Sequence, residues 1–213
     1  MSATARNTRA LQLAARREQF LAAAERMFLK EGFAKTSVNA IVREAGGSLA
    51  TLYAEFGTKE ALFESVLSQR AARFFPETRP RPPTGACDAG AELRRLATHM
   101  LKRMLTEDAL AVYRICVYEA PHFPGLRKAV LEVGIPGLLQ GTARHLIDLA
   151  AVHALRIDDA DLAASQFVAL VQGQLVLMAA CGEHIDARTR DRQIVNAVHA
   201  FLRLYPVCGG KRD

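Results

Sequence analysis

Thr36 to Phe63 reads TSVNAIVREAGGSLATLYAEFGTKEALF, and this stretch decides the fold. Its apolar residues recur at helical spacing in two short runs that meet at Gly46-Gly47, and a third run follows Thr58. Glycine commonly ends a helix, and serine or threonine commonly caps the start of the next one. Two short helices joined by a turn are typical of a helix-turn-helix DNA reader. The stretch therefore predicts a DNA-binding module near the N-terminus.

The residues before and after this pair predict two more helices. Phe20, Met27 and Phe28 lie on one stripe of a helix that starts at about residue 10, and Gly32 ends it. The hairpin helices are expected from near Ser37 and over residues 49–55, with Ser48 as a cap. The helix capped by Thr58 carries its own apolar stripe. A three-helix module followed by a connecting helix results.

Composition limits the class of protein. The chain has 213 residues, half of them apolar, and 28 basic against 22 acidic side chains, a net charge of +6 that only weakly favours an anionic partner. No apolar run is long enough to cross a bilayer, and the N-terminus lacks the apolar segment of a secretory signal. The four cysteines are far apart and have no metal-ligand spacing. We expect a cytoplasmic protein with reduced thiols, no metal, no cofactor and no membrane partner.

Proline and glycine gather at residues 76–90 and predict a linker. Beyond it the apolar pattern is helical, with helices expected at about 91–105, 108–119, 126–133, 136–153, 159–181 and 187–205. Asp158 and Asp186 are the expected caps of the last two. The sequence thus predicts an all-α fold with a DNA-binding domain at 1–57, a connecting helix at 58–75, the linker, and a larger helical domain at 91–213.

Position selects the side chains that would meet DNA. The second helix of such a hairpin enters the major groove, and neighbouring helix starts hold phosphates with hydroxyl and backbone N–H groups. Tyr53 offers a phenol to a phosphate oxygen, and Lys59 adds its charge at the start of a helix. The full set of expected DNA-contacting residues is Thr36, Ser37, Ser48, Leu49, Ala50, Thr51, Tyr53 and Lys59.

The stretch resembles the DNA-binding domain of the TetR family of bacterial repressors. The resemblance is carried by Ala45-Gly46, Ser48, Thr51-Leu52-Tyr53, Phe56, Thr58-Lys59-Glu60 and Leu62-Phe63. It implies a fold of about nine to ten helices, phosphate contacts from Ser37, Ser48, Tyr53 and Lys59, and base-edge positions for Leu49, Ala50 and Thr51.

Three residues depart from the family pattern. Gly47 replaces an apolar residue, which removes a packing contact; Leu49 replaces a frequent basic residue and cannot pair with guanine; Glu55 opposes phosphate unless it turns away or pairs with Lys35 or Arg43. We therefore expect phosphate contacts and DNA shape to carry much of the affinity.

Each of these residues has a plainer interpretation when it is taken alone. Ser48 is a helix cap in many proteins that bind no DNA, Tyr53 is a packed residue, and Lys59 is a solvated charge. Only the shared spacing favours DNA binding. The arginines between residues 6 and 17 are either an arm along DNA or a soluble tail, and the sequence does not separate the two.

The helix expected from Leu162 to Ala180 is apolar on nearly every face, and the last helix has a broad apolar stripe. One core does not easily cover both, so we expect a homodimer joined by a four-helix bundle rather than a monomer. A two-fold dimer would also set two recognition helices about one DNA turn apart on a palindromic operator. The expected interface residues are Leu162, Phe167, Leu170, Gly173, Ile194, Val198, Phe201 and Leu202.

The C-terminal module resembles the AefR-like group within the TetR family, through residues 113–126 (YRICVYEAPHFPGL) and the run 158–173. The resemblance implies a cavity for a small effector. Its expected wall consists of Met100, Met104, Tyr113, Cys116, Val117, His122, Phe123, Phe167 and Met178, each of which is otherwise an ordinary core or structural residue.

The leading hypothesis is a ligand-responsive transcriptional repressor that binds operator DNA as a homodimer and is released by a small lipophilic effector. One alternative is an enzyme or small-molecule-binding protein that uses the C-terminal pocket, where Tyr113, Cys116, Glu119 and His99 converge. In that case the helix-turn-helix serves packing only. No nucleophile, phosphate or metal motif supports catalysis, so we expect a protein that is not an enzyme.

Overall fold

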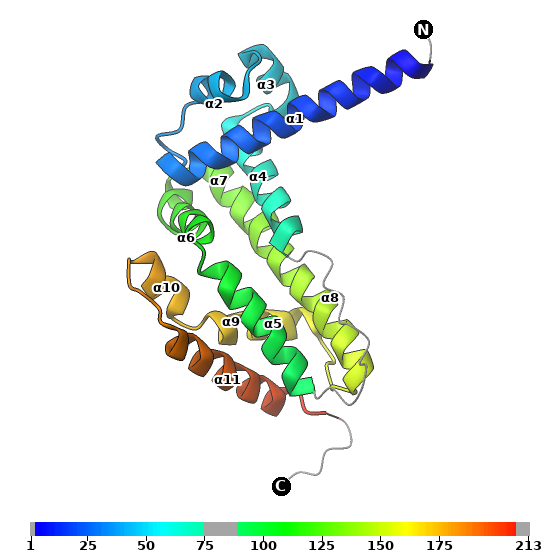
Figure 1. Cartoon of the computed structure of the whole chain (residues 1–213), viewed down its shortest axis with the longest axis vertical. Coiled ribbons are helices and arrows are strands. Elements are labelled where there is room, and N and C mark those ends of the chain that lie inside the picture. Colours follow the sequence, from blue (N-terminus) through cyan, green and yellow to red (C-terminus); the bar gives the residue numbers. More distant parts are fainter. Residues whose placement is uncertain (1–2, 75–88, 208–213) are drawn as a thin grey trace. The chain divides into compact units, whose positions relative to one another are not determined.

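The computed structural model describes residues 3–74 and 89–207, and every regular element in these two ranges is helical (Figure 1). These ranges also contain an isolated antiparallel β-bridge between Leu155 and Val207. The all-α prediction is confirmed. Most of the expected linker lies outside the described residues, as do Cys87, Cys208 and the side chains of Arg6 and Arg9.

The N-terminal helices follow the sequence pattern closely. Their bounds are α1 (Ala3–Glu31), α2 (Val38–Ala45), α3 (Leu49–Phe56) and α4 (Lys59–Phe74). α1 begins about two turns earlier than expected, and it ends where Gly32 adopts a φ of +82°. The predicted caps Ser37 and Ser48 are confirmed, because each side chain accepts the backbone N–H three residues ahead.

The remaining helices are more broken than the sequence pattern predicts. They are α5 (Ala89–Met104), α6 (Glu107–Arg114), the π-helix η1 (Ile115–Glu119), the 3-10 helix η2 (Ala120–His122), α7 (Pro124–Ala129), the π-helix η3 (Val130–Gly134), α8 (Ile135–His153), α9 (Ala160–Gln172), α10 (Leu175–Ala180) and α11 (Ala187–Leu204).

Two of these boundaries correct the sequence analysis. The single helix expected over 159–181 is divided at Gly173, whose φ of +47° ends α9. The cap of α9 is Asp159 rather than Asp158, and its carboxylate accepts the N–H groups of Asp161 and Leu162. Asp186 caps α11 as expected.

The chain divides into two compact units, and the first combines residues 1–70 with residues 111–134. Its core contains a cluster of aromatic rings: the Phe33 ring centroid lies 5.6 Å from those of Phe28 and Phe63 and 5.2 Å from that of Phe123. Leu126 is fully buried in the same core. The segment 111–134, which we had grouped with the C-terminal module, therefore packs with the helix-turn-helix.

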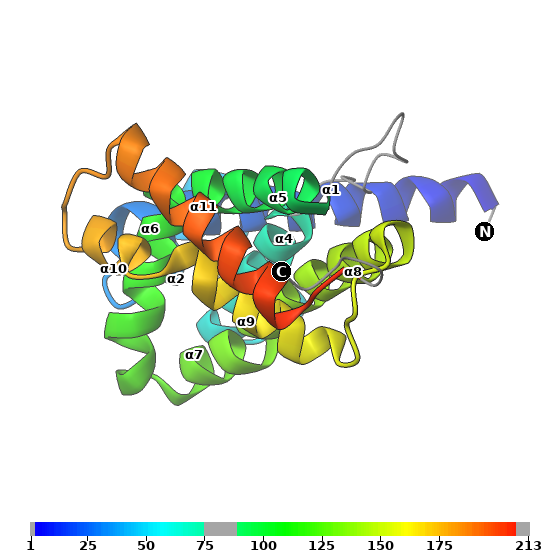
Figure 2. The ribbon, with the colours of Figure 1, turned by 90° about the horizontal axis from the view of Figure 1, so that it is seen from below.

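The second unit comprises residues 71–110 and 135–213. Within it α9 packs against α5, α8 and α11, and Figure 2 shows α11 running beside α5 and α9. Phe167 and Phe201 meet edge to face with their centroids 4.9 Å apart. At the break after α9, Gln193 Nε2 donates to the Leu170 carbonyl at 2.6 Å, which replaces the helical bond that Gly173 interrupts.

Candidate DNA-binding site

Helix α3 has one buried face and one exposed face. Leu52 is fully buried and Phe56 nearly so, four residues apart on the inner side. Leu49 and Tyr53, also four residues apart, lie on the outer side with 37% and 47% of their surface exposed. Ala50 and Thr51 are exposed as well. Ser48, which caps the helix, is exposed too, so all five residues expected at the exposed start and side of this helix are accessible to a partner.

The turn before α3 has a reason to contain two glycines. Gly46 and Gly47 have φ values of +72° and +111°, which side chains rarely adopt. A Cβ at Gly47 would lie only 3.1 Å from Cζ of Phe20, a buried residue of α1. The sequence interpretation of Gly47 as a lost packing contact is corrected, because the Phe20 ring fills that place. Arg16 Nη1 also lies against this turn, 3.6 Å from a Cβ built at Gly46.

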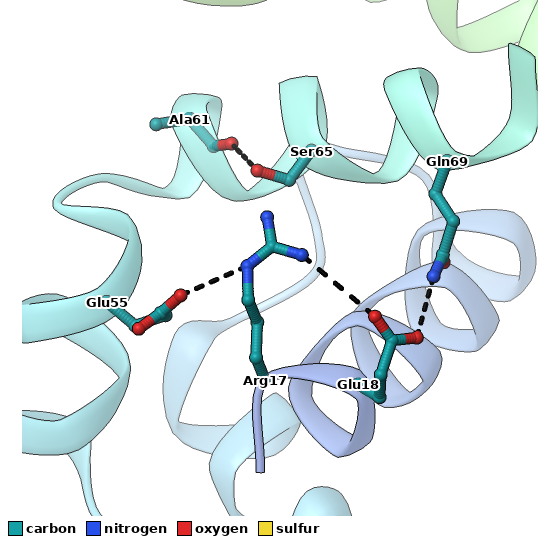
Figure 3. Close-up of polar contacts among 6 residues, drawn as sticks. All are labelled: Arg17, Glu18, Glu55, Ala61, Ser65 and Gln69. Atoms are coloured by element: carbon teal, nitrogen blue, oxygen red, sulfur yellow. Dashed lines mark hydrogen bonds and ion pairs between the residues drawn. The ribbon is translucent and has the colours of Figure 1, made fainter. Parts of the chain in front are cut away.

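The acid of the recognition helix is paired. Arg17 Nε lies 3.0 Å from Glu55 Oε1 (Figure 3). The Arg17 guanidinium also covers the Phe56 ring, 5.5 Å from its centroid. The partner is thus Arg17 of α1, not Lys35 or Arg43 as expected from the sequence. Figure 3 shows Glu18 beside Arg17, where Glu18 Oε1 lies 4.0 Å from Arg17 Nη1. Glu18 Oε2 accepts from Gln69 Nε2 of α4 at 2.7 Å. Nearby, Ser65 donates to the Ala61 carbonyl of the preceding turn at 3.0 Å.

Ser37 and Thr36 have different surroundings although they are neighbours. Ser37 is exposed at the start of α2, where it accepts from the N–H of Ala40 at 3.2 Å. Thr36 is buried, with 2% of its surface exposed. Its hydroxyl donates to the carbonyls of Gly32 at 2.7 Å and Met27 at 3.2 Å. The expected phosphate contact from Thr36 is corrected to a structural role at the end of α1.

Lys59 is held at the start of α4 rather than extended into solvent. Its Nζ lies 4.3 Å above the centroid of the Phe33 ring and 3.4 Å from the Ala34 carbonyl oxygen. Burial lowers the pKa of the Lys59 ammonium, and the carboxylates of Glu60 and Glu119 act in the opposite direction. The cation therefore sits beside the turn that leads into α2, where Ser37 lies.

The residues expected to line an effector cavity fall in both units. Met100, Met104 and Phe167 are buried within the second unit. Cys116 and Phe123 are partly buried and pack against the core of the first unit, and Tyr113 is also partly buried there. Val117, His122 and Met178 are exposed.

Half of the expected dimer residues are already packed within one chain. Phe167, Ile194, Val198 and Phe201 are buried in the second unit, so they have no surface to offer. Leu162 is exposed, and Leu170 and Leu202 are partly so. Gly173 is exposed too. The second unit also exposes large apolar side chains that we had not selected: Ile147, Leu177, Val195 and Leu204.

The catalytic grouping considered from the sequence is not supported by the described residues. Glu119 uses its carboxylate on the backbone N–H groups of Phe33 and Ala34. Burial raises the pKa of the Cys116 thiol to about 11, which leaves it protonated and weakly nucleophilic near neutral pH. Within the described ranges, no group of three or more His, Cys, Asp or Glu side chains is placed to hold a metal, and no helix is long and apolar enough to span a membrane.

Two family models match the chain. The model for bacterial regulatory proteins of the tetR family matches residues 20–66, and the model for the AefR-like transcriptional repressor C-terminal domain matches residues 91–207. They cover the helix-turn-helix and most of the remaining chain. Both resemblances found in the sequence are confirmed.

Several solved structures of transcriptional regulators are similar to this chain over most of its length. A putative TetR-family transcriptional regulator from Mesorhizobium loti is 25% identical with a TM-score of 0.77, covering 92% of this chain and 98% of its own. The flavonoid-responsive regulator FrrA is 30% identical with a TM-score of 0.68, covering 89% and 96%. A TetR regulator from Agrobacterium tumefaciens is 24% identical with a TM-score of 0.70, covering 89% and 94%. No functionally curated protein matches the chain at a significant level.

Proposed function

The chain belongs to the TetR family of bacterial transcriptional regulators, and from this we propose that it is a repressor that binds operator DNA as a homodimer and is released by a small effector. A helix-turn-helix regulator of this kind acts by occupying DNA and not by chemistry on a substrate. The regulator fold favours this over the enzyme alternative.

The observation that carries the proposal is the two-faced recognition helix. Leu52 and Phe56 anchor α3 in the core, while Leu49 and Tyr53 on the opposite face are exposed. The exposed leucine and tyrosine lie four residues apart on one side of α3 and leave that face available to a partner. Apolar Leu49 and Ala50 suit thymine methyl groups, and Tyr53 suits a phosphate oxygen.

The homodimer is supported by apolar surface in the second unit. Leu162 of α9, Leu177 of α10 and Leu204 of α11 are each more than half exposed. Exposed apolar side chains that together form a contiguous patch are typical of a protein interface. We propose these residues, in place of the four buried ones, as the centre of the contact between two copies.

The effector is proposed to be lipophilic. Met100, Met104 and Phe167 are buried apolar side chains of the second unit. A cavity among them would suit ligands with little charge. FrrA, which shares 30% identity over most of both chains, is a flavonoid-responsive regulator, and flavonoids contain aromatic rings. An aromatic effector is therefore the first class to test. It would weaken DNA binding by binding the released state more tightly than the operator-bound state.

The test is sequence-specific binding by the full-length protein without effector. We expect purified protein to protect a site upstream of its own gene and to bind that duplex at least about a thousandfold more tightly than a random duplex of equal length. Affinity should fall steeply as salt rises, because phosphate contacts release counterions. Equal affinity for both duplexes at moderate salt would refute the proposal.

A further inference from the structure

Glu119 contacts the DNA-binding module from a distant part of the sequence. One carboxylate oxygen accepts the backbone N–H of Phe33 at 3.0 Å, and the other accepts the N–H of Ala34. These two amides follow Gly32, where the chain leaves α1 with a φ of +82°. They can no longer continue the helical bonding of α1, so the carboxylate supplies the acceptor that the backbone does not.

The carboxylate of Glu119 approaches Gly32 closely. A Cβ at Gly32 would lie 2.8 Å from Glu119 Oε1, a distance that such atoms essentially never reach. Phe123, four residues after Glu119, packs edge to face on Phe33 with their centroids 5.2 Å apart. The turn at 32–34 is therefore held by a polar contact and an apolar contact from the same segment.

The turn at 32–34 lies against Lys59 and shortly before Ser37, which are two of the expected phosphate contacts. Lys59 Nζ lies against the Phe33 ring and the Ala34 carbonyl, so both residues that Glu119 fixes through their amides also fix the lysine. Two residues further on, Thr36 fastens the turn to the end of α1, and Ser37 begins α2. A rotation of the turn would move Lys59 and Ser37 together.

From this geometry we propose that Glu119 is a positioning residue for DNA binding: its carboxylate orients the 32–34 turn and thereby the phosphate-contacting Lys59 and Ser37. Glu119 does not touch DNA in this proposal. It ends a π-helix, η1, an irregular element of a kind that is frequent at functional sites. A change in η1 would thus reach the DNA contacts through one side chain. The inference rests on the proposed function.

The sign of the expected effect separates positioning from charge. Glu119→Gln removes a negative charge near a DNA-binding surface, so electrostatics alone predicts equal or tighter binding to phosphate. Positioning predicts the reverse, because glutamine has one acceptor oxygen and would present its NH₂ group to one of the two amides. We expect E119Q to bind the upstream duplex about tenfold more weakly than the natural chain.

A matched control is available in the same segment. Glu132 in η3 is paired only across 3.9 Å with Lys128 at an exposed site, so Glu132→Gln makes the same change in charge without disturbing the turn. Affinity of E132Q should stay within about twofold of the natural chain, as for most exposed pairs.

The salt dependence gives a second measurement. In E119Q the slope of log affinity against log salt should fall by about 0.9, which corresponds to the loss of one phosphate contact. A role in stability alone would leave that slope unchanged.

Hydrogen exchange tests the contact without DNA. The amides of Phe33 and Ala34 should exchange slowly in the natural chain and much faster in E119Q, while the amides of Ile41 and Leu52 remain protected in both. If E119Q does not fold, Glu119→Asp replaces it: the charge is retained, the reach is one methylene shorter, and weaker DNA binding is again expected.

The outcomes are distinct. If the natural chain prefers its upstream region but E119Q, or E119D in its place, binds as tightly as E132Q, the inference is overturned and the proposed function stands. Fast exchange of the Phe33 and Ala34 amides in the natural chain would overturn it equally. If the natural chain shows no preference for its upstream region, the proposed function fails and the role of Glu119 in DNA binding fails with it.

Discussion

Arg17 Nε lies 3.0 Å from Glu55 Oε1, so a cation from α1 neutralises the acid on the recognition helix (Figure 3). Both side chains are about two-fifths exposed, and a pair of this kind adds less than about 1 kcal/mol to stability. Its effect on DNA binding is larger in principle, because an unpaired carboxylate beside phosphates is repelled. The pair lets a helix with an acid approach DNA.

Replacing Arg17 by alanine should therefore weaken operator binding by about fivefold, roughly 1 kcal/mol of surface electrostatics. Arg17 could lose affinity for another reason, a direct phosphate contact of its own. The double variant R17A/E55Q separates the two: removal of the acid should restore most of the affinity if pairing is what matters. Fluorescence anisotropy on the upstream duplex measures both variants. Failure of the second substitution to rescue binding would assign the loss to Arg17 alone.

Thr36 and Thr51 make a pair of opposite predictions. Valine at position 36 removes a buried hydroxyl that donates to two carbonyls, and should lower the free energy of unfolding by about 1–2 kcal/mol. Operator affinity of the folded protein should not change. Valine at exposed position 51 should do the reverse. Denaturant unfolding and anisotropy decide the matter, and a T36V variant of normal stability with weak DNA binding would reinstate the phosphate contact.

Gly47 and Gly57 separate steric overlap from backbone strain. Both have positive φ, +111° and +77°, so alanine costs on the order of 1–2 kcal/mol of strain at either position. Only at Gly47 would the new Cβ also meet another residue, Phe20, whereas at Gly57 it meets nothing within 4 Å. We expect G47A to be the less stable variant in thermal unfolding. Equal destabilisation would show that the Phe20 ring moves aside freely.

Local features of this fold were predictable from the sequence. Ser37, Ser48 and Asp186 cap helices because a hydroxyl or carboxylate on an extended residue at a helix start can reach the free N–H groups just ahead of it. Gly32 ends α1 for an equally local reason, since glycine adopts the required φ of +82° without steric cost. These contacts span three or four residues, and spacing alone describes them.

Contacts between distant residues were not predictable in the same way. Glu119 and Phe33 are 86 positions apart, and neither residue type nor spacing indicates that one accepts from the other. The sequence indicates Lys35 or Arg43 as the partner of Glu55, but Glu55 pairs with Arg17 of α1. A single signal was available for Thr36: it stands four residues after Gly32, within reach of the carbonyls that the end of α1 leaves free.

Cys116 and Cys181 should differ in reactivity. Burial raises the pKa of Cys116 to about 11 from 9.0, so its thiolate is scarce at pH 8, whereas Cys181 is exposed. Alkylation of the native protein followed by peptide mapping should modify Cys181 much faster. Because the folded pKa lies above the unfolded one, the protonated Cys116 contributes stability below pH 9 that is lost as pH rises toward 11. Comparable alkylation of Cys116 at pH 8 would contradict its burial.

Lys59 gives a prediction about salt rather than affinity alone. Lys59→Ala should remove one phosphate contact, which lowers the slope of log affinity against log salt by about 0.9 and weakens binding most at low salt. Lys128→Ala removes the same charge from an exposed position of α7, and should leave the slope unchanged. Titrations of the upstream and random duplexes over a range of salt measure both.

Because a phosphate contact carries no sequence information, K59A should lose affinity for the two duplexes in the same proportion. A loss confined to the upstream duplex would instead make Lys59 a reader of base edges.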